Sequence, residues 1–158
     1  MALTAKQIIQ KYWDDGSLPV NPTAIANKMG IAVLADPHLD GSGHFIPIDT
    51  LTGRPLIVYN PTEHRVRQRF TIAHELGHYV LNHGERNRDK PEQFSMSFGD
   101  PVETDANTFA ARLLMPATFV HALVQIRGIT GVPTLARMFD VSQAAMRYRL
   151  KELHYAVG

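Results

Sequence analysis

Two histidines, His74 and His78, stand four residues apart, and Glu75 directly follows the first of them. On an α-helix, residues four apart lie on one face, so both imidazoles can reach the same metal ion. Glu75 is turned from His74 by about 100° around the helix axis. That position suits a carboxylate that takes a proton from water beside the metal, and it does not suit a third ligand. The His-Glu-x-x-His spacing is typical of zinc hydrolases.

A catalytic zinc ion needs three protein ligands and one position open to water. The chain has no cysteine, which excludes thiolate ligands. Glu103 and Asn107 stand four residues apart beside the apolar stripe of a second predicted helix. We predict Glu103 as the third ligand and Asn107 as the acceptor of a ring N–H from a ligand histidine, which fixes its tautomer. Asp105 is the rival ligand and faces a different side from Asn107.

Two amphipathic helices are expected to carry these residues. Apolar side chains recur at helical spacing over residues 70–81, around both histidines. This helix is expected to start at Pro61-Thr62 and to stop at Gly84. The second helix is expected to begin after Asp100, a residue that suits the N-cap, because a proline follows it.

Three short apolar runs, at residues 31–34, 43–48 and 55–60, predict a small three-stranded sheet packed against the motif helix. A Thr-Gly pair at 52–53 predicts the hairpin turn between the second and third strands. Pro47 suits an edge strand, because proline cannot donate a hydrogen bond to a neighbour. We therefore expect the strand at 43–48 to be a sheet edge to which an extended peptide can add.

The sequence FTIAHELGH at 70–78, followed by E-x-D-A-N-x-F-A-A-x-L-L-M-P at 103–116, resembles the ImmA/IrrE family of zinc metallo-endopeptidases. The likeness is strongest over residues 55–120. It implies a gluzincin-type site with one zinc ion per chain and a compact α/β peptidase domain. It also implies a characteristic substrate, a helix-turn-helix repressor encoded nearby, whose cleavage relieves repression. The family usually carries an acidic residue where Asp105 stands, so both acidic residues remain candidates for the third ligand.

We therefore expect a zinc-dependent endopeptidase in which Glu75 is the general base. Two other functions remain open. The first is a DNA-binding regulator whose zinc is structural, which a closed site with four protein ligands would favour. The second is a peptidase fold that acts as a sensor or adaptor without proteolysis, which a zinc-loaded protein that never cleaves its neighbour would favour.

Peptide hydrolysis also requires a hydrogen-bond donor for the negative charge that develops on the carbonyl oxygen. The candidates in the sequence are Tyr79, His44, Arg112, His121 and Tyr148. The sequence does not choose among them. Residues 85–99 are polar and lack periodicity, so we expect a loop that serves either as a solvated connector or as a lid over the site.

The C-terminal segment has helix-turn-helix spacing over residues 134–150, with one helix ending near Phe139 and Ser142 capping the next. Three cations between 147 and 151 make it locally basic. We expect two packed helices that close the domain, with these cations in solvent. Direct DNA binding is not expected, because affinity for DNA depends on many phosphate contacts.

The overall composition predicts an α+β fold, mostly helical. At 158 residues and 44% hydrophobic, the chain can bury a substantial core. We expect a metallopeptidase domain at 1–126 and a helix-turn-helix-like extension packed on it at 127–158. A net charge of +1 argues against electrostatic binding of nucleic acid over the whole protein surface. The sequence has no apolar run of membrane length and no signal-peptide core, and the absence of cysteine fits a cytoplasmic protein without a membrane partner.

Overall fold

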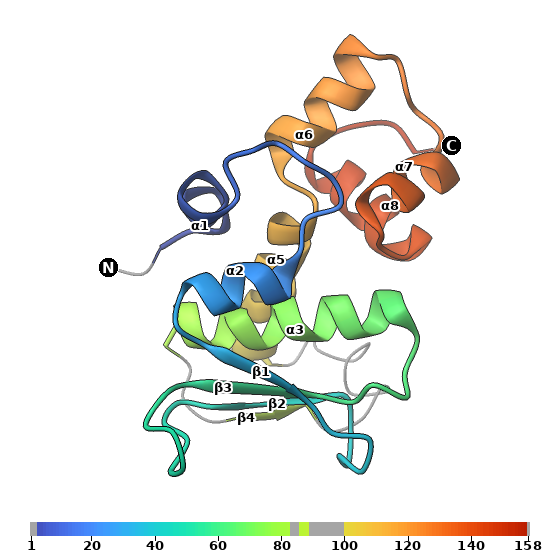
Figure 1. Cartoon of the computed structure of the whole chain (residues 1–158). Helices are drawn as coiled ribbons and strands as arrows, with labels where there is room; N and C mark the ends of the chain where they lie inside the picture. The colour runs from blue at the N-terminus through green and yellow to red at the C-terminus, as the bar shows by residue number, and fades with distance from the viewer. Residues whose placement is uncertain (1–2, 83–85, 89–99, 158) are drawn as a thin grey trace.

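The structure is a computed structural model that describes residues 3–82, 86–88 and 100–157. Its central element is the helix α3 (Arg65–Val80), which lies along one face of a small sheet (Figure 1). The sheet order is β1 (Ala32–Ala35), β3 (Leu56–Tyr59), β2 (Gly43–Ile46) and β4 (Arg86–Arg88). β1 pairs with β3 in parallel, whereas β2 runs antiparallel to both β3 and β4. The fold is α+β, as predicted.

The three predicted strands form, with bounds that shift by one or two residues. The turn at 52–53 is also present: Gly53 has a φ of +71°, and its N–H donates to the Asp49 carbonyl over 2.7 Å.

The prediction that the strand at 43–48 is a sheet edge is wrong. β2 lies between β3 and β4 and pairs with both, so residues 43–45 already have strand neighbours on each side. β4 lies within the stretch 85–99 that was expected to be a loop, and the remainder of that stretch falls outside the described residues.

α3 begins later than expected, at Arg65 and not at Pro61-Thr62. The reason is local. Asn60 accepts hydrogen bonds from the backbone N–H and the hydroxyl of Thr62, at 3.0 and 2.6 Å, and holds this stretch as a turn. The helix ends at Val80, because Asn82 turns into the left-handed region with a φ of +60°. The expected stop at Gly84 lies outside the described residues.

α5 (Pro101–Leu114) starts as predicted, with the Asp100 side chain accepting the backbone N–H groups of Val102 and Glu103. It packs directly on α3. Gly77 makes this close approach feasible, because a Cβ there would lie 3.0 Å from Cδ1 of Phe109 and 3.4 Å from Cα of Ala106. The two helices therefore come together where both carry the polar residues of the motifs.

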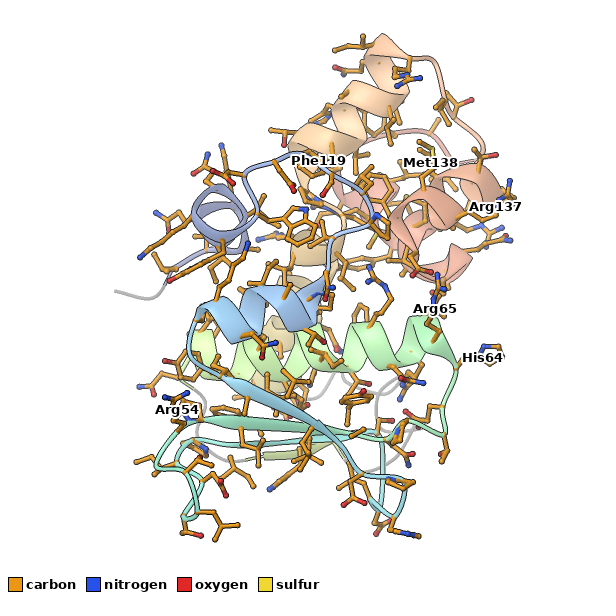
Figure 2. All side chains as sticks on the ribbon, viewed as in Figure 1. Arg54, His64, Arg65, Phe119, Arg137 and Met138 are labelled. Carbon is orange, nitrogen blue, oxygen red and sulfur yellow. The ribbon has the colours of Figure 1, made fainter. Side chains whose placement is uncertain are left out.

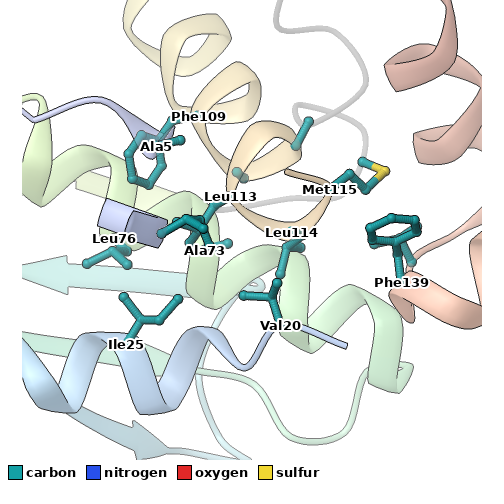
Figure 3. Close-up of a cluster of buried hydrophobic side chains, with 14 of the residues drawn as sticks. Ala5, Val20, Ile25, Ala73, Leu76, Phe109, Leu113, Leu114, Met115 and Phe139 are labelled. Carbon is teal, nitrogen blue, oxygen red and sulfur yellow. The ribbon is translucent and has the colours of Figure 1, made fainter. Parts of the chain in front are cut away.

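The core joins the N-terminal and C-terminal helices to α3 and α5. The remaining helices are α1 (Ala5–Tyr12), α2 (Pro22–Lys28), α6 (Ala117–His121), the π-helix η2 (Ala122–Ile126), α7 (Val132–Phe139) and α8 (Gln143–Glu152). Figure 3 shows Ile25 of α2, Leu76 of α3, Leu114 of α5 and Phe139 of α7 within one buried cluster. No single helix of the described residues is long and apolar enough to cross a membrane; α5 together with Ala117–Ile126 passes that test only as a pair bent by 50°.

α7 and α8 form the expected helix-turn-helix, with Asp140 in the left-handed region and Ser142 capping α8 through the Ala145 N–H. The turn is bound to α3. The Arg69 guanidinium donates to the carbonyls of Asp140, Val20 and Phe139, at 3.0, 2.7 and 3.3 Å. Arg65 extends from the start of α3 toward the same turn and pairs with Asp140 at 2.6 Å (Figure 2).

One of the three cations expected in solvent is part of the core. Arg149 is 4% exposed, donates to the Met115 carbonyl over 2.9 Å and pairs with Glu152 at 2.5 Å. A buried guanidinium is retained because these partners satisfy its donors. The exposed positive charge of α8 is therefore reduced to Arg147 and Lys151.

Candidate metal centre

Three donor atoms from two helices meet between α3 and α5. His74 Nε2 lies 3.0 Å from Glu103 Oε2 and 3.0 Å from His78 Nε2, and His78 Nε2 lies 2.9 Å from the same carboxylate oxygen. Both histidine side chains are fully buried, and the Glu103 side chain is 18% exposed. These residues form a group that could hold a metal ion.

Asn107 contacts the other ring nitrogen of His74. Its Oδ1 lies 2.8 Å from His74 Nδ1. With the amide oxygen toward the ring, the ring proton sits on Nδ1, and Nε2 presents a lone pair to the Glu103 carboxylate. Two acceptors at this separation repel each other unless a positive charge lies between them. Two imidazole nitrogens and one carboxylate oxygen are a donor set that zinc accepts, so the residues fit a divalent metal ion of this kind.

The Glu103 carboxyl is shifted toward its ionised form. Burial would raise the pKa of this carboxyl. When the rings of His74 and His78 are protonated instead, their hydrogen bonds and positive charge outweigh burial, so the pKa of Glu103 lies well below its usual range. This direction depends on positive charge beside the carboxylate, which either protonated imidazoles or a metal ion would provide. Glu103 is therefore ionised, as a metal ligand must be.

Asp105, the rival ligand, is exposed and is not a member of the group found among the described residues. Two positions along α5 separate it from Glu103, which turns its side chain by about 200° around the helix. The structure therefore places Glu103 with the histidines and leaves Asp105 facing away.

Glu75 is fully buried beside the group without belonging to it. Its Oε2 lies 3.8 Å from His74 Nε2. The side chain faces β2, because a Cβ added at Gly43 would lie 3.4 Å from Glu75 Cγ. A carboxylate in this position is close enough to the donor group to exchange a proton with water there.

Tyr79 is the oxyanion candidate closest in sequence to the donor group. It lies four residues after Glu75 and thus on the same stripe of α3. The residue is 36% exposed, and its ring packs edge-on against Phe45 with ring centroids 5.8 Å apart. A phenol hydroxyl on a partly exposed ring beside the buried carboxylate can meet a bound peptide.

The structure does not bring His44 to the group. Successive side chains of a strand point to opposite faces, and both Gly43 and Phe45 face α3. The His44 side chain therefore points to the other face of the sheet. His44 therefore stays a prediction as an oxyanion donor, on the face of β2 opposite to the one that meets α3.

Arg112, His121 and Tyr148 belong to the C-terminal part of the fold. Arg112 binds Glu152 through Nε and Nη2, at 3.1 and 2.7 Å, and stands nine residues along α5 from Glu103, about 13 Å by helix geometry. His121 contacts the Tyr155 hydroxyl. Tyr148 is exposed on α8, which reaches the C-terminal end of α5 through Arg149. Arg112 and His121 thus contact the C-terminal segment, and Tyr148 lies on its surface. As oxyanion candidates all three stay predictions.

Gly43 and Thr71 were not singled out in the sequence, although both lie next to Glu75. A Cβ at Gly43 would lie 2.4 Å from Cγ2 of Thr71. A glycine within a strand is a signal of close backbone approach, and that signal was present in the sequence. Thr71 carries no comparable signal, because a threonine on a helix facing a sheet is ordinary.

Known proteins share this chain's sequence pattern. Residues 26–151 match the model of the peptidase M78 family, described as the IrrE N-terminal-like domain. The chain is 34% identical over 128 residues to the radiation response metalloprotease IrrE of Deinococcus deserti, which covers 68% of this chain and 42% of that protein. It is 34% identical over 106 residues to the metallopeptidase ImmA of Bacillus subtilis, which covers 66% of this chain and 60% of that protein.

A solved structure supports the fold. A Mycobacterium tuberculosis transcriptional regulator superposes with a TM-score of 0.63 at 19% identity, covering 92% of this chain and 44% of that one. At this identity the likeness concerns the fold alone. The chain spans 42% of the length of the Deinococcus deserti relative and 60% of the Bacillus subtilis one. Since the family model covers residues 26–151, the chain belongs to the peptidase M78 family of IrrE N-terminal-like domains.

Proposed function

We propose that this chain is a zinc-dependent endopeptidase that cuts a helix-turn-helix repressor at one position. The observation that carries the proposal is the group formed by His74, His78 and Glu103, with the Glu75 carboxylate buried beside it and outside it. Three ligands and a separate carboxylate are what hydrolysis requires, whereas a structural zinc site is closed by four protein ligands.

His74 and His78 would bind one zinc ion through Nε2, and Glu103 through a carboxylate oxygen. When bound, the ion supplies the positive charge that acidifies water and polarises a peptide carbonyl. Asn107 keeps the proton of His74 on Nδ1 and thereby keeps Nε2 available as a ligand atom.

Glu75 would act as the general base and then as the general acid. Its carboxylate accepts a proton from water as the water oxygen bonds to the peptide carbonyl carbon. It then passes that proton to the amine nitrogen as the C–N bond breaks. The Glu75 side chain is fully buried, so protein packing and not solvent surrounds the carboxylate. The Tyr79 hydroxyl would donate a hydrogen bond to the carbonyl oxygen as negative charge develops.

The repressor is proposed as the substrate because of the resemblance in sequence to the ImmA/IrrE family, and the relatives fit it. One is named metallopeptidase ImmA, and another is named an uncharacterized immunity region protein of Bacillus phage phi105. The burial of Arg149 supports the expectation that α8 does not itself bind DNA, because only two exposed cations remain on that helix.

The test is incubation of the zinc-loaded protein with the repressor encoded beside its gene, followed by mass spectrometry of the products. We expect one cut, in an accessible linker or inter-helix loop, and little or no degradation of casein. Broad casein degradation with an intact repressor would point to a general peptidase. A zinc-loaded protein that cuts neither would favour the sensor or adaptor.

A further inference from the structure

β2 lies close against α3 at Gly43. A Cβ at this position would lie 2.4 Å from Thr71 Cγ2, 3.3 Å from the Val58 carbonyl oxygen and 3.4 Å from Glu75 Cγ. The 2.4 Å contact is shorter than any real Cβ contact, and the atom it meets is a methyl on a short, branched side chain. Any other residue at position 43 would therefore displace the Thr71 side chain, β2 or α3.

The side chains that meet β2 form one stripe of α3. Thr71, Glu75 and Tyr79 are spaced by four residues and therefore share a face of the helix. Gly43 lies against Thr71 and Glu75, and Phe45, two residues along the same strand face, packs against Tyr79. β2 thus runs along the stripe, with Glu75 enclosed between its two contacts.

Thr71 meets the strand through its methyl group. The residue is fully buried, and its hydroxyl makes no hydrogen bond within the part of the chain that the structure describes. The Thr71 side chain therefore contacts β2 by packing and not by a hydrogen bond.

We propose that Gly43 and Thr71 are a positioning pair for Glu75: the contact of the bare glycine with the threonine methyl sets the separation of β2 and α3 and thereby the place of the Glu75 carboxylate. The inference rests on the proposed function, since it assigns a role in that hydrolysis. Bringing a 2.4 Å contact to an ordinary 3.4 Å by separating strand and helix, with the Thr71 rotamer kept, requires a shift of 1 Å. A misplacement of about 1 Å can lower a catalytic rate by roughly a hundredfold.

The test compares repressor cleavage by the wild type, Gly43→Ala, and double variants that combine Gly43→Ala with Thr71→Ser or Thr71→Val. We expect Gly43→Ala to lower kcat by about tenfold to a hundredfold, with zinc content unchanged because the ligands come from α3 and α5. KM should change by less than about threefold, because substrate contacts outside this gap remain. Thr71→Ser removes the methyl and should restore most of kcat, whereas Thr71→Val keeps it and should not. The single Thr71 variants supply the reference rates.

Gly131→Ala is the matched control, because a Cβ there meets nothing closer than 3.9 Å and it lies far along the chain from the donor group. It should leave kcat unchanged. Equal rescue by serine and valine, or a Gly43→Ala enzyme as fast as the wild type, would overturn the proposal. If Gly43→Ala fails to fold, the same comparison is made between the two double variants, and recovery of activity with serine alone supports it. A wild type that cleaves no repressor would instead contradict the proposed function.

Discussion

Asn107 of α5 contacts His74 of α3, with 2.8 Å between Asn107 Oδ1 and His74 Nδ1. The contact crosses between two helices and orients the imidazole on the side away from Glu103. It joins the two helices that carry the donor group, and it decides which ring nitrogen carries the proton.

Replacing Asn107 should therefore weaken metal binding without removing a ligand. We expect Asn107→Ala to lower zinc affinity by about tenfold to a hundredfold, because the tautomer and orientation of His74 are no longer fixed. Competition with a chelator measures the affinity. Asn107→Asp keeps an oxygen acceptor for the ring N–H and should retain much more of the zinc affinity. An equal loss of zinc affinity in both variants would contradict the role given to this acceptor.

The two acidic residues of α5 should differ sharply. Glu103→Gln should lower zinc affinity by orders of magnitude, since a neutral amide is a poor ligand and two histidines remain. Asp105→Asn should change it little, because Asp105 is exposed and turned away. Zinc content after dialysis distinguishes them. The reverse ranking would transfer the ligand to Asp105.

Arg69 should be a major contributor to stability. Its guanidinium satisfies the carbonyls of Val20, Phe139 and Asp140. Arg69→Ala leaves these acceptors without their donor, and we expect the free energy of unfolding to fall by about 3 kcal/mol. Arg65→Ala is the comparison, because the Arg65 side chain is 75% exposed and its removal should matter little. Denaturant unfolding of both variants measures the difference, and equal effects would contradict this role of Arg69.

The C-terminal packing should be sensitive to acid. Burial would raise the pKa of Glu152, but hydrogen bonds and charge from Arg112 and Arg149 outweigh it and lower the pKa below the ordinary value of 4.5. A carboxyl whose pKa is lowered on folding stabilises the protein fully above 4.5 and loses that contribution as the pH falls through the folded pKa. Unfolding of the wild type and Glu152→Gln at several pH values tests this. Their difference in stability should be largest near neutrality and shrink on acidification; a constant difference would exclude linkage to Glu152.

The donor group was predictable because it lies on long amphipathic helices. The helical period alone determines which side chains share a face, and this holds for His74 with His78 and for Glu103 with Asn107. The prediction that residues 43–48 form an edge strand failed for the opposite reason. β4 has three residues and no alternation, and its pairing with β2 depends on contacts distant in sequence.

Other features depended on partners that the sequence does not reveal. The sequence alone predicts Arg149 as a solvated cation. In the fold its guanidinium donates to the carbonyl of Met115, 34 residues earlier. The close approach of β2 to α3 depends in the same way on Thr71 meeting a glycine from another element. Burial of charge and the fit of two elements are properties of the tertiary fold.

The central claim, that Glu75 is the general base and not a ligand, is tested most directly by measuring zinc content and repressor cleavage of Glu75→Gln beside the wild type. The account predicts about one zinc per chain in both proteins, and cleavage by Glu75→Gln at a rate lower by about a hundredfold or more. Loss of zinc from Glu75→Gln, or cleavage of the repressor at the wild-type rate, would contradict it.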